Sequence, residues 1–423
     1  MLDPKLIRND PDRVRNGIAA KGADPSRVAE WLALDEKRRD IVRQVEMLKA
    51  ERNTSSTQIG VVMKSGGDAG DMKDAVRRLG GDIKGMDDAL RELDEQIHAL
   101  AQWFPNLPHE TTPLGDESAN QVIRTWGEPV RHDFPALTHD ELGAKLGILE
   151  MERAARMSGS GFTVLRGAGA ALNRALIAFM IDLHVQEHGY TELAVPYLVK
   201  RDSLFGTGQL PKLAEDMYRT EPDDLFLIPT AEVSITNLHR EEMLTEDDLP
   251  MYYVGHSACF RRESGSHGKD TKGMTRVHQF DKVEMVRFVE PSRCYDELEI
   301  LLGNAETVLQ KLGLAYRVQL LASGDISFAA SKCYDIDVWA PGADRWLEVS
   351  SCSSFEGFQA RRADIRYRPA DGGRPEHVHT INGSGLALPR TIIALLETYQ
   401  TAEGTVRIPE VLQPYLGGLT ELS

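Results

Sequence analysis

A regular apolar repeat runs through residues 72–100 of this chain. Its members are spaced alternately four and three positions apart, at Met72, Val76, Leu79, Ile83, Met86, Leu90, Leu93, Ile97 and Leu100. This spacing places the apolar side chains in one stripe along a helix, which is the pattern of a coiled-coil seam. The repeat therefore predicts a long helix that packs its stripe against another helix.

A weaker form of the same repeat occupies the preceding segment, at Trp31, Leu34, Ile41, Val45, Leu48, Ile59 and Val62. Between the two repeats, residues 63–71 (MKSGGDAGD) have the composition of a turn. Two heptad helices joined by a short loop fold back as an antiparallel hairpin. Helices of about 35 residues would form an arm about 50 Å long. Gly80, Gly81 and Gly85 should weaken the second helix, each by about 1 kcal/mol relative to alanine.

An arm of this kind has little core of its own, and the sequence leaves two functions open for it. Heptad helices commonly mediate oligomerisation, whereas a protruding arm can also contact a large partner such as a structured RNA. The first helix favours RNA through a basic cluster of Arg38, Arg39, Arg43, Lys49 and Arg52. The second helix does not, because it is acidic, with Asp87, Asp88, Glu92, Asp94 and Glu95.

The charge and the cysteines restrict the partners and the compartment. A net charge of −16 argues against a surface coated with nonspecific nucleic-acid contacts, so any RNA contact should be local. The four cysteines have no CxxC spacing, which indicates free thiols in a reducing cytoplasm and no zinc site. The first residues, MLDPKLIRND, lack an apolar run, so we expect no signal peptide; we also expect no membrane-spanning segment.

A domain boundary follows the second repeat. Residues 104–120 (FPNLPHETTPLGDESAN) are rich in Pro, Thr and Asn, as linkers are. We therefore expect a helical arm over residues 1–105, a linker and entry to the core over 106–130, and a main domain over 131–423.

The main domain contains a predicted hairpin with an unusual polar face. Residues 251–261 are rich in Tyr, Val and Phe and predict its first strand. In the second strand, residues 276–289, the pleat places Phe280, Lys282 and Glu284 together, opposite an apolar face. A cation, an aromatic ring and a carboxylate on one strand face suit a nucleotide. A solvated hairpin with ordinary surface charges has the same composition, and the pattern alone does not separate the two.

The loop between these strands is long and glycine-spaced. It contains glycines and cations at Gly265, His267, Gly268, Lys269, Lys272 and Gly273. We expect a flexible flap that closes over a ligand rather than a tight turn, because long loops are usually functional. No GxxxxGK[ST] motif precedes a helix, so the loop is not a P-loop.

Other segments of the main domain predict helices and strands in clusters. Residues 168–187 have apolar side chains at helical spacing. Residues 225–240 predict a strand that leaves Thr230 and Glu232 beside a proline turn. Residues 332–351 predict another hairpin, which turns at Pro341.

The last of these segments, residues 381–397, predicts a glycine turn followed by an apolar helix. Pro389 is tolerated in the first turn of that helix, and Arg390 follows it. An arginine near a helix N-terminus can face a phosphate together with the helix dipole. Because the elements do not alternate as βαβ units, we expect an α+β fold with an antiparallel sheet.

Three segments give the chain a family resemblance: GYTELAVPYLV, FRRE…RVHQFDKVE and GSGLALPR. They are similar to the three motifs of class II aminoacyl-tRNA synthetases. In combination with TAE, EVSSCS and the coiled-coil arm, they resemble the bacterial-type seryl-tRNA synthetases, from MLDPKLIRN to RIPEVLQPYLGG. The resemblance implies a class II antiparallel β-sheet flanked by helices and preceded by an antiparallel two-helix coiled-coil arm.

The resemblance also implies an ATP site. Arg261 would hold the α-phosphate and Arg390 the γ-phosphate, and these two are the implied catalytic residues. Glu263 would bind the adenine amine, Phe280 would stack on adenine, and Arg276 would hold the distal phosphates. The full implied set is Arg261, Arg262, Glu263, Arg276, Val277, His278, Gln279, Phe280, Glu348, Val349, Ser350, Ser351 and Arg390.

For the amino acid, the resemblance implies a serine pocket of Thr230, Ala231, Glu232, Glu284, Asn382 and Ser384. Glu348 and Ser351 would hold a Mg²⁺ or Mn²⁺ ion that bridges ATP. Strict pleating places these two residues on opposite faces of a strand, so shared ligation requires a bulge or a strand end there. Without such a feature, Glu348 is an ordinary charge on a strand face.

The activity implied by the resemblance is that of a serine–tRNA ligase. L-serine would be activated by ATP to seryl-adenylate and then transferred to the 3′ end of tRNA(Ser). The arm would contact the tRNA, and tRNA(Sec) is a further substrate to consider because it shares the tRNA shape. The resemblance also implies a cytoplasmic homodimer that needs no zinc.

Two other classes of function stay open on the residues alone. A degenerate paralogue would bind RNA or act as a scaffold without activation chemistry, but Arg261, Glu263, Glu284, Glu348 and Arg390 are all present. An amino-acid:carrier-protein ligase built on the same core would not need the long arm. Serine-dependent ATP–pyrophosphate exchange would separate the three.

Overall fold

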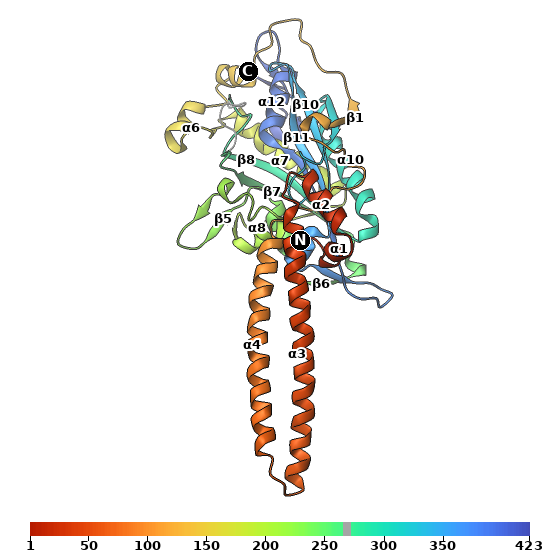
Figure 1. Cartoon of the computed structure of the whole chain (residues 1–423). Helices are drawn as coiled ribbons and strands as arrows, with labels where there is room; N and C mark the ends of the chain where they lie inside the picture. Colours follow the sequence, from red (N-terminus) through yellow and green to blue (C-terminus); the bar gives the residue numbers. More distant parts are fainter. Residues whose placement is uncertain (265–271) are drawn as a thin grey trace. The chain divides into compact units, whose positions relative to one another are not determined.

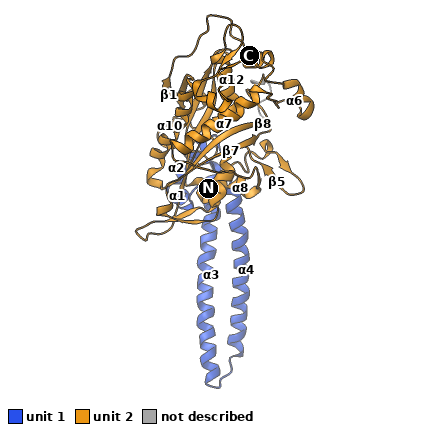
Figure 2. Cartoon of the chain, turned by 180° about the vertical axis from the view of Figure 1, so that it is seen from behind, with its two compact units in different colours: residues 1–105 blue, residues 106–423 orange. Residues whose placement is uncertain are grey.

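The computed structural model describes residues 1–264 and 272–423. These residues form two compact units, residues 1–105 and residues 106–423 (Figures 1 and 2). The expected linker, residues 106–130, therefore belongs to the second unit. Within that unit, the Asn106 side chain donates a hydrogen bond to the carbonyl of Phe355, at 2.8 Å.

The first unit is a helical hairpin. Two long helices, α3 (Ser26–Lys64) and α4 (Gly70–Ala101), pack along each other and follow two short ones, α1 (Pro4–Asn9) and α2 (Pro11–Ala20) (Figure 1). The lengths of 39 and 32 residues correspond to about 58 and 48 Å. The heptad repeats thus predict the two-helix arm and its turn correctly.

Ion pairs within the hairpin explain why its first helix is basic and its second acidic. Arg38 pairs with Asp94 and Lys49 pairs with Asp87, so both contacts join α3 to α4. The cation–carboxylate pairs are solvent-accessible and each contributes at most about 1 kcal/mol. Much of the basic cluster predicted from the sequence is therefore used inside the hairpin.

The glycines inside α4 should limit its stability. A Cβ built on Gly80, Gly81 or Gly85 would meet no heavy atom within 4 Å. Alanine at each position is expected to raise the free energy of unfolding of the helix by about 1 kcal/mol, because it reduces the backbone freedom of the unfolded chain. Amide hydrogen exchange in α4 should slow accordingly.

Gly66 provides the matched control, because it lies in the turn of the same hairpin. A Cβ there would also meet nothing within 4 Å, but its φ of +81° is in the left-handed region. Alanine at this position should destabilise the turn, since only backbone conformation distinguishes the site. Faster exchange in α4 after the Gly81→Ala change would contradict the expectation.

The second unit is built on an eight-stranded sheet with the strand order β1-β9-β10-β11-β14-β8-β7-β2. All neighbouring strands are antiparallel except β2 and β7. This confirms the predicted antiparallel sheet. In the order given, the strands are β1 (Gln121–Trp126), β9 (Tyr316–Leu320), β10 (Lys332–Ala340), β11 (Arg345–Glu356), β14 (His379–Ala387), β8 (Gln279–Val289), β7 (Met251–Phe260) and β2 (Thr191–Glu192). The strand predicted over residues 276–289 therefore begins three residues later, at Gln279.

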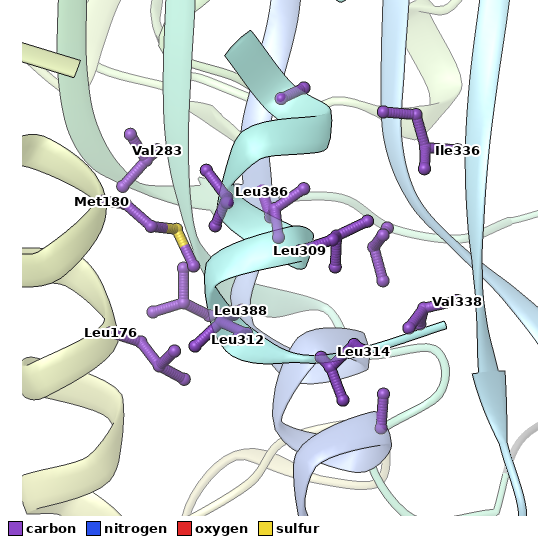
Figure 3. Close-up of a cluster of buried hydrophobic side chains, with 14 of the residues drawn as sticks. Leu176, Met180, Val283, Leu309, Leu312, Leu314, Ile336, Val338, Leu386 and Leu388 are labelled. Carbon is purple, nitrogen blue, oxygen red and sulfur yellow. The ribbon is translucent and has the colours of Figure 1, made fainter. Parts of the chain in front are cut away.

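Three helices cover one face of this sheet: α7 (Ala168–Gln186), α10 (Cys294–Leu312) and α12 (Leu388–Tyr399). Their apolar side chains meet those of the sheet in a large core, part of which is drawn in Figure 3. Val283 and Ile336 point into this core from β8 and β10. Because side chains alternate along a strand, the residues next to these two point to the opposite face of the sheet.

Smaller elements surround the sheet. Three minor sheets pair β5 (Leu225–Leu227) with β3 (Leu198–Lys200) and β4 (Arg219–Thr220), β12 (Arg366–Arg368) with β13 (Glu376–His377) and β6 (Met243–Thr245), and β15 (Val406–Arg407) with β16 (Glu421–Leu422). The shorter helices are α5 (His139–Lys145), α6 (Met151–Ser158), α8 (Arg201–Thr207), α9 (Glu232–Thr236) and α11 (Phe358–Ala363).

Two of the local predictions are wrong. The strand predicted over residues 225–240 ends at Leu227, and α9 begins at Glu232. Between them the hydroxyl of Thr230 accepts a bond from the Glu232 N–H, a local contact that competes with strand pairing. The glycine turn predicted at residue 381 is instead part of β14. The register of β14 shifts at Gly385, which makes a bulge directly before α12.

Helix α7 satisfies the length and composition of a membrane span, with a mean hydropathy of 1.3. The expectation that no segment has such a composition is therefore wrong. Half of this window is buried within the structure, and Leu172, Leu176 and Met180 belong to the core. Packing against the sheet gives the helix a reason to be apolar.

Candidate active site

A cavity of about 720 Å³ opens on the polar face of the sheet. Its wall is formed by parts of β8, β11 and β14, by residues directly after β7, by the start of α12 and by residues near the end of α8. Most of the site residues implied by the sequence line this cavity: Thr230, Glu232, Arg261, Glu263, Arg276, Val277, Phe280, Glu284, Glu348, Val349, Ser351, Asn382, Ser384 and Arg390.

The β8 strand positions three of the cavity side chains through its pleat. Phe280, Lys282 and Glu284 all line the cavity, whereas Val283 and Met285 lie in the core on the other face. This alternation is the one predicted from the sequence. Strand β8 pairs with β14 on one side and with β7 on the other, and this pairing fixes the side chains that face the cavity.

Other implied residues do not line the cavity: Ala231, Arg262, His278, Gln279 and Ser350. The guanidinium of Arg262 lies over the ring of Tyr218, 5.9 Å from its centroid. The Nδ1 of His278 forms a hydrogen bond with the backbone carbonyl of Arg261 at 3.0 Å, and the ring packs beside Phe162. His278 therefore supports the backbone next to the cavity.

The remaining three have structural positions. Ala231 is fully buried in a separate small core, and Gln279 is exposed at the first position of β8. The hydroxyl of Ser350 donates to the backbone carbonyl of Ser384 at 2.7 Å, which ties β11 to β14. No side chain of these three reaches the cavity.

Two arginines of the cavity pair with carboxylates of the same cavity. Arg276 is 3.3 Å from Glu263, and Arg390 is 3.2 Å from Glu348. Arg390 Nη1 also donates to the backbone carbonyl of Glu348 at 2.8 Å. Glu263 adopts a left-handed backbone with φ of +50°, a conformation that is uncommon for this residue type and is frequent at functional sites.

The third arginine, Arg261, lies over an aromatic ring. Its guanidinium carbon is 5.1 Å from the centroid of Phe280, within the range of a cation–π contact. Its Nε is 3.4 Å from the backbone carbonyl of Pro229. These two contacts hold the guanidinium of Arg261 in the wall of the cavity.

Polar side chains of the cavity wall also form a buried network. The Glu284 carboxylate accepts bonds from Thr230 at 3.0 Å and from Asn382 at 3.1 Å. The ammonium of Lys282 forms an ion pair with Glu284 and donates to the hydroxyl of Thr230 at 2.9 Å. All of these residues are buried, and their hydrogen bonds fix the positions of the polar groups in the network.

Glu232 lines the same cavity, and its pKa is raised. Burial, followed by the charge of Glu284, raises the pKa of Glu232 to about 7. The amide of Gln359 donates to Glu232 Oε1 at 2.6 Å and to the carbonyl of Thr207 at 3.1 Å. The oxygen of the same amide accepts from Thr380 at 2.7 Å, which fixes the orientation of Gln359.

A bulge in β11 brings Glu348 and Ser351 to the same face. Ile336 of β10 is opposite Ser350, but the next residue, Asp337, is opposite Glu348, so one residue of β11 is unpaired. This is the irregularity that shared ligation requires. Both residues line the cavity.

The surroundings of Glu348 are strongly acidic. Burial and the charge of Glu348 raise the pKa of Asp335 well above its usual value, and burial raises the pKa of Asp337. Oxygen donors of this kind suit a hard divalent cation. Within the part of the chain that the structure describes, no group of three or more His, Cys, Asp or Glu residues is arranged as a metal site.

Sequence reasoning missed several residues of the site. Lys282 shares the cavity face of β8 with Phe280 and Glu284, and this pattern could have assigned it. Gln359 and the cavity residue Phe328 lie outside the hairpin in sequence, beyond α10, and no local pattern indicates them. Much of the predicted flap, residues 265–271, lies outside the described residues.

Comparison with sequence families gives two matches. Residues 1–108 match the family described as "Seryl-tRNA synthetase N-terminal domain". Residues 215–399 match the family described as "tRNA synthetase class II core domain (G, H, P, S and T)". The second match includes all the cavity residues from Asp216 to Arg390.

Individual proteins are similar over the whole chain. A serine–tRNA ligase of Caldicellulosiruptor bescii is 54% identical over 99% of this chain and 99% of its own length. The structure of seryl-tRNA synthetase from Pyrococcus horikoshii, complexed with ATP, has a TM-score of 0.95 at 36% identity, covering 100% of this chain and 99% of that one. The serine–tRNA ligase from Naegleria fowleri, in complex with AMP, has a TM-score of 0.90 at 30% identity, with coverage of 100% and 99%.

Proposed function

The chain belongs to the seryl-tRNA synthetase family, and we propose that its cavity activates L-serine with ATP and then transfers it to the 3′ end of tRNA(Ser). One observation supports this assignment above all. Arginines suited to a triphosphate and acidic groups suited to an ammonium line the same cavity. The two substrates can therefore meet within one pocket.

The first step needs orientation and charge neutralisation rather than an enzyme nucleophile. The serine carboxylate attacks the α-phosphorus of ATP in line, and pyrophosphate leaves. Arg261 would hold the α-phosphate, since its guanidinium faces the cavity beside Phe280, where adenine would stack. Arg276 and Arg390 would hold the distal phosphates.

The ion pairs of the cavity explain how ATP could be received without burying unpaired charges. Arg276 and Arg390 have carboxylate partners before ATP binds, namely Glu263 and Glu348. Phosphate oxygens would replace these carboxylates on the arginines. The released Glu263 would then be available for the adenine amine.

A divalent cation fits the second released carboxylate. The bulge places Glu348 and Ser351 on the cavity face, and burial, followed by the charge of Glu348, raises the pKa of the neighbouring Asp335. These oxygens suit Mg²⁺ or Mn²⁺ and are not the ligands of a structural zinc site. When bound, the ion would neutralise phosphate charge.

The acidic side chains of the cavity would recognise serine. Glu284 and Glu232 can bind the ammonium, and Thr230, Asn382 and Ser384 line the space for the hydroxyl. A pocket that hydrogen-bonds the hydroxyl rejects alanine by about 10⁴–10⁵, because buried partners would otherwise stay unpaired.

The second step transfers the seryl group from the adenylate to a ribose hydroxyl of the tRNA. The helical arm would supply contacts to the tRNA, and the remaining exposed cations of the arm would act locally. We include tRNA(Sec) as a second candidate substrate, and a homodimer in the cytoplasm. The four cysteines are free thiols, which agrees with a reducing compartment.

The test of this function is selectivity. The protein should support ATP–pyrophosphate exchange with serine and much less with threonine, alanine or glycine, and it should charge a tRNA(Ser) transcript. Exchange without charging would support the carrier-protein ligase. Absence of exchange with serine would favour the degenerate paralogue and contradict the proposal.

The pKa of Glu232 leads to a prediction for pH. Below about pH 7 this carboxyl is neutral, and above it the carboxylate can bind the serine ammonium. Serine binding should therefore tighten as pH rises, and kcat/KM for serine should increase about tenfold between pH 6 and 8. The Glu232→Gln variant, which cannot titrate, should have a flat profile in this range. A wild-type profile that is already flat would contradict the role of Glu232.

A further inference from the structure

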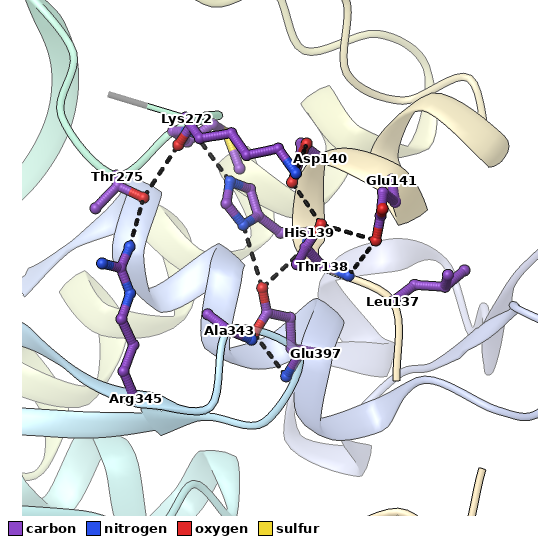
Figure 4. Close-up of polar contacts among 12 residues, drawn as sticks. Leu137, Thr138, His139, Asp140, Glu141, Lys272, Thr275, Ala343, Arg345 and Glu397 are labelled. Atoms are coloured by element: carbon purple, nitrogen blue, oxygen red, sulfur yellow. Dashed lines mark hydrogen bonds and ion pairs between the residues drawn. The ribbon is translucent and has the colours of Figure 1, made fainter. Parts of the chain in front are cut away.

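A second polar cluster lies behind the cavity wall and is not part of the site described above. It is centred on His139, the first residue of α5, and Glu397, near the end of α12 (Figure 4). Their exposed fractions are 5% and 0%. Polar groups buried this completely need defined hydrogen-bond partners, and both have them.

The Glu397 carboxylate joins three segments of the chain. Its Oε1 accepts from the backbone N–H of His139 at 2.9 Å and from His139 Nδ1 at 3.2 Å. Its Oε2 accepts from the N–H groups of Gly342 and Ala343, both at 3.0 Å, in the turn between β10 and β11. All these contacts direct protons toward the carboxylate, so His139 carries its proton on Nδ1.

The other nitrogen of His139 faces the end of the long loop between β7 and β8. The backbone N–H of Met274 donates to His139 Nε2 at 3.0 Å. At Gly273, φ is +62° and an added Cβ would lie 2.0 Å from this Nε2. The imidazole therefore packs directly on the backbone of residues 273–274, and only glycine leaves room for it.

This backbone also reaches the arginines of the cavity. Met274, Thr275 and Arg276 line the cavity. The carbonyl of Thr275 accepts from Arg390 Nε at 3.3 Å, and its hydroxyl lies 3.4 Å from Arg345 Nη2. The position of residue 274 thus affects two of the three cavity arginines, Arg276 through the chain and Arg390 through a hydrogen bond.

We propose that His139 is a positioning residue for ATP: held by Glu397, it fixes the backbone of residues 273–275 and through it the side chains of Arg276 and Arg390. The imidazole does not line the cavity, so it acts through these residues. The inference rests on the proposed function of the cavity as an ATP site. It concerns the distal phosphates and not the serine pocket, because the hydrogen bonds of His139 and Glu397 described here involve no residue of the serine pocket.

The test compares ATP and serine parameters in variants of the full chain. The His139→Ala variant should raise KM for ATP in serine-dependent exchange by about tenfold or more, with KM for serine within about twofold of wild type. The His139→Gln variant keeps one donor and one acceptor, and should recover most of the ATP affinity. Direct titration with ATP in the absence of serine should follow the same order.

His132 supplies the matched control. Its Nε2 contacts the backbone carbonyl of the same Glu397 at 2.9 Å, but it has no contact with residues 273–275 among those described. The His132→Ala variant should leave KM for ATP unchanged. The Gly273→Ala variant should instead reproduce the effect of His139→Ala, since its Cβ would displace the imidazole.

Three results would overturn the inference. One is an unchanged KM for ATP in His139→Ala. Another is an equal change in the parameters for ATP and serine together with a lower melting temperature, because a purely structural role would produce it. The third is a wild-type protein that binds no ATP, which would contradict both the proposed function and this inference. Normal exchange in the wild type together with an unaffected His139→Ala variant would contradict the inference alone.

Discussion

The Arg261→Met variant is expected to lose about 10²–10³ of kcat in serine-dependent ATP–pyrophosphate exchange, equivalent to about 3–4 kcal/mol of barrier. The guanidinium of Arg261 lies over Phe280 in the wall of the cavity, where it would neutralise charge that develops at the α-phosphate. Methionine keeps much of the length of the side chain but removes its charge. Exchange measured at saturating ATP and serine gives the effect on kcat directly.

The neighbouring Arg262 makes this prediction selective. Sequence resemblance assigns both arginines to ATP, but the structure places Arg262 against Tyr218 and outside the cavity lining. The Arg262→Met variant should therefore change kcat little. Equal losses in the two variants would contradict the placement of Arg261 as the residue that holds the α-phosphate.

Shortening the helical arm should separate the two half-reactions. Removal of residues 26–103 is expected to abolish charging of tRNA(Ser), while serine-dependent exchange stays close to the wild-type rate. The physical reason is that every residue lining the cavity belongs to the second unit, residues 106–423. Charging and exchange measured on the same preparation give the comparison.

A smaller deletion controls for damage to the fold. Removing residues 50–86 and joining the ends with a short turn keeps the ion pairs Lys49–Asp87 and Arg38–Asp94, and with them the base of the hairpin. This variant should also lose most charging activity and keep exchange. Loss of exchange in both variants would show that the arm is needed for the structure of the catalytic unit.

Features that depend on short-range patterns were predictable from the sequence. The heptad spacing from Met72 to Leu100 predicts α4, since a helix brings residues three and four apart to one side. The pleat of β8 likewise predicts that Phe280 and Glu284 share a face, as they do. The bulge between Glu348 and Ser351 is the irregularity that the family resemblance required, since it implied that both residues hold one ion.

Features that depend on tertiary contacts were not predictable. Residues 225–240 contain strand-forming residues, but the strand ends at Leu227, and the local contact of Thr230 with the N–H of Glu232 precedes a helix. Gly385 suggested a turn, whereas pairing with β8 and β11 keeps its segment in the sheet. His139 and Glu397 are 258 residues apart, and nothing in either local sequence connects them.

A crystal structure with a non-hydrolysable seryl-adenylate analogue would examine the shared cavity itself. The phosphate mimic should lie on Arg261 with adenine on Phe280, while the seryl ammonium contacts Glu284 or Glu232. An analogue bound elsewhere on the chain, or bound with its seryl group away from these carboxylates, would contradict the proposed function.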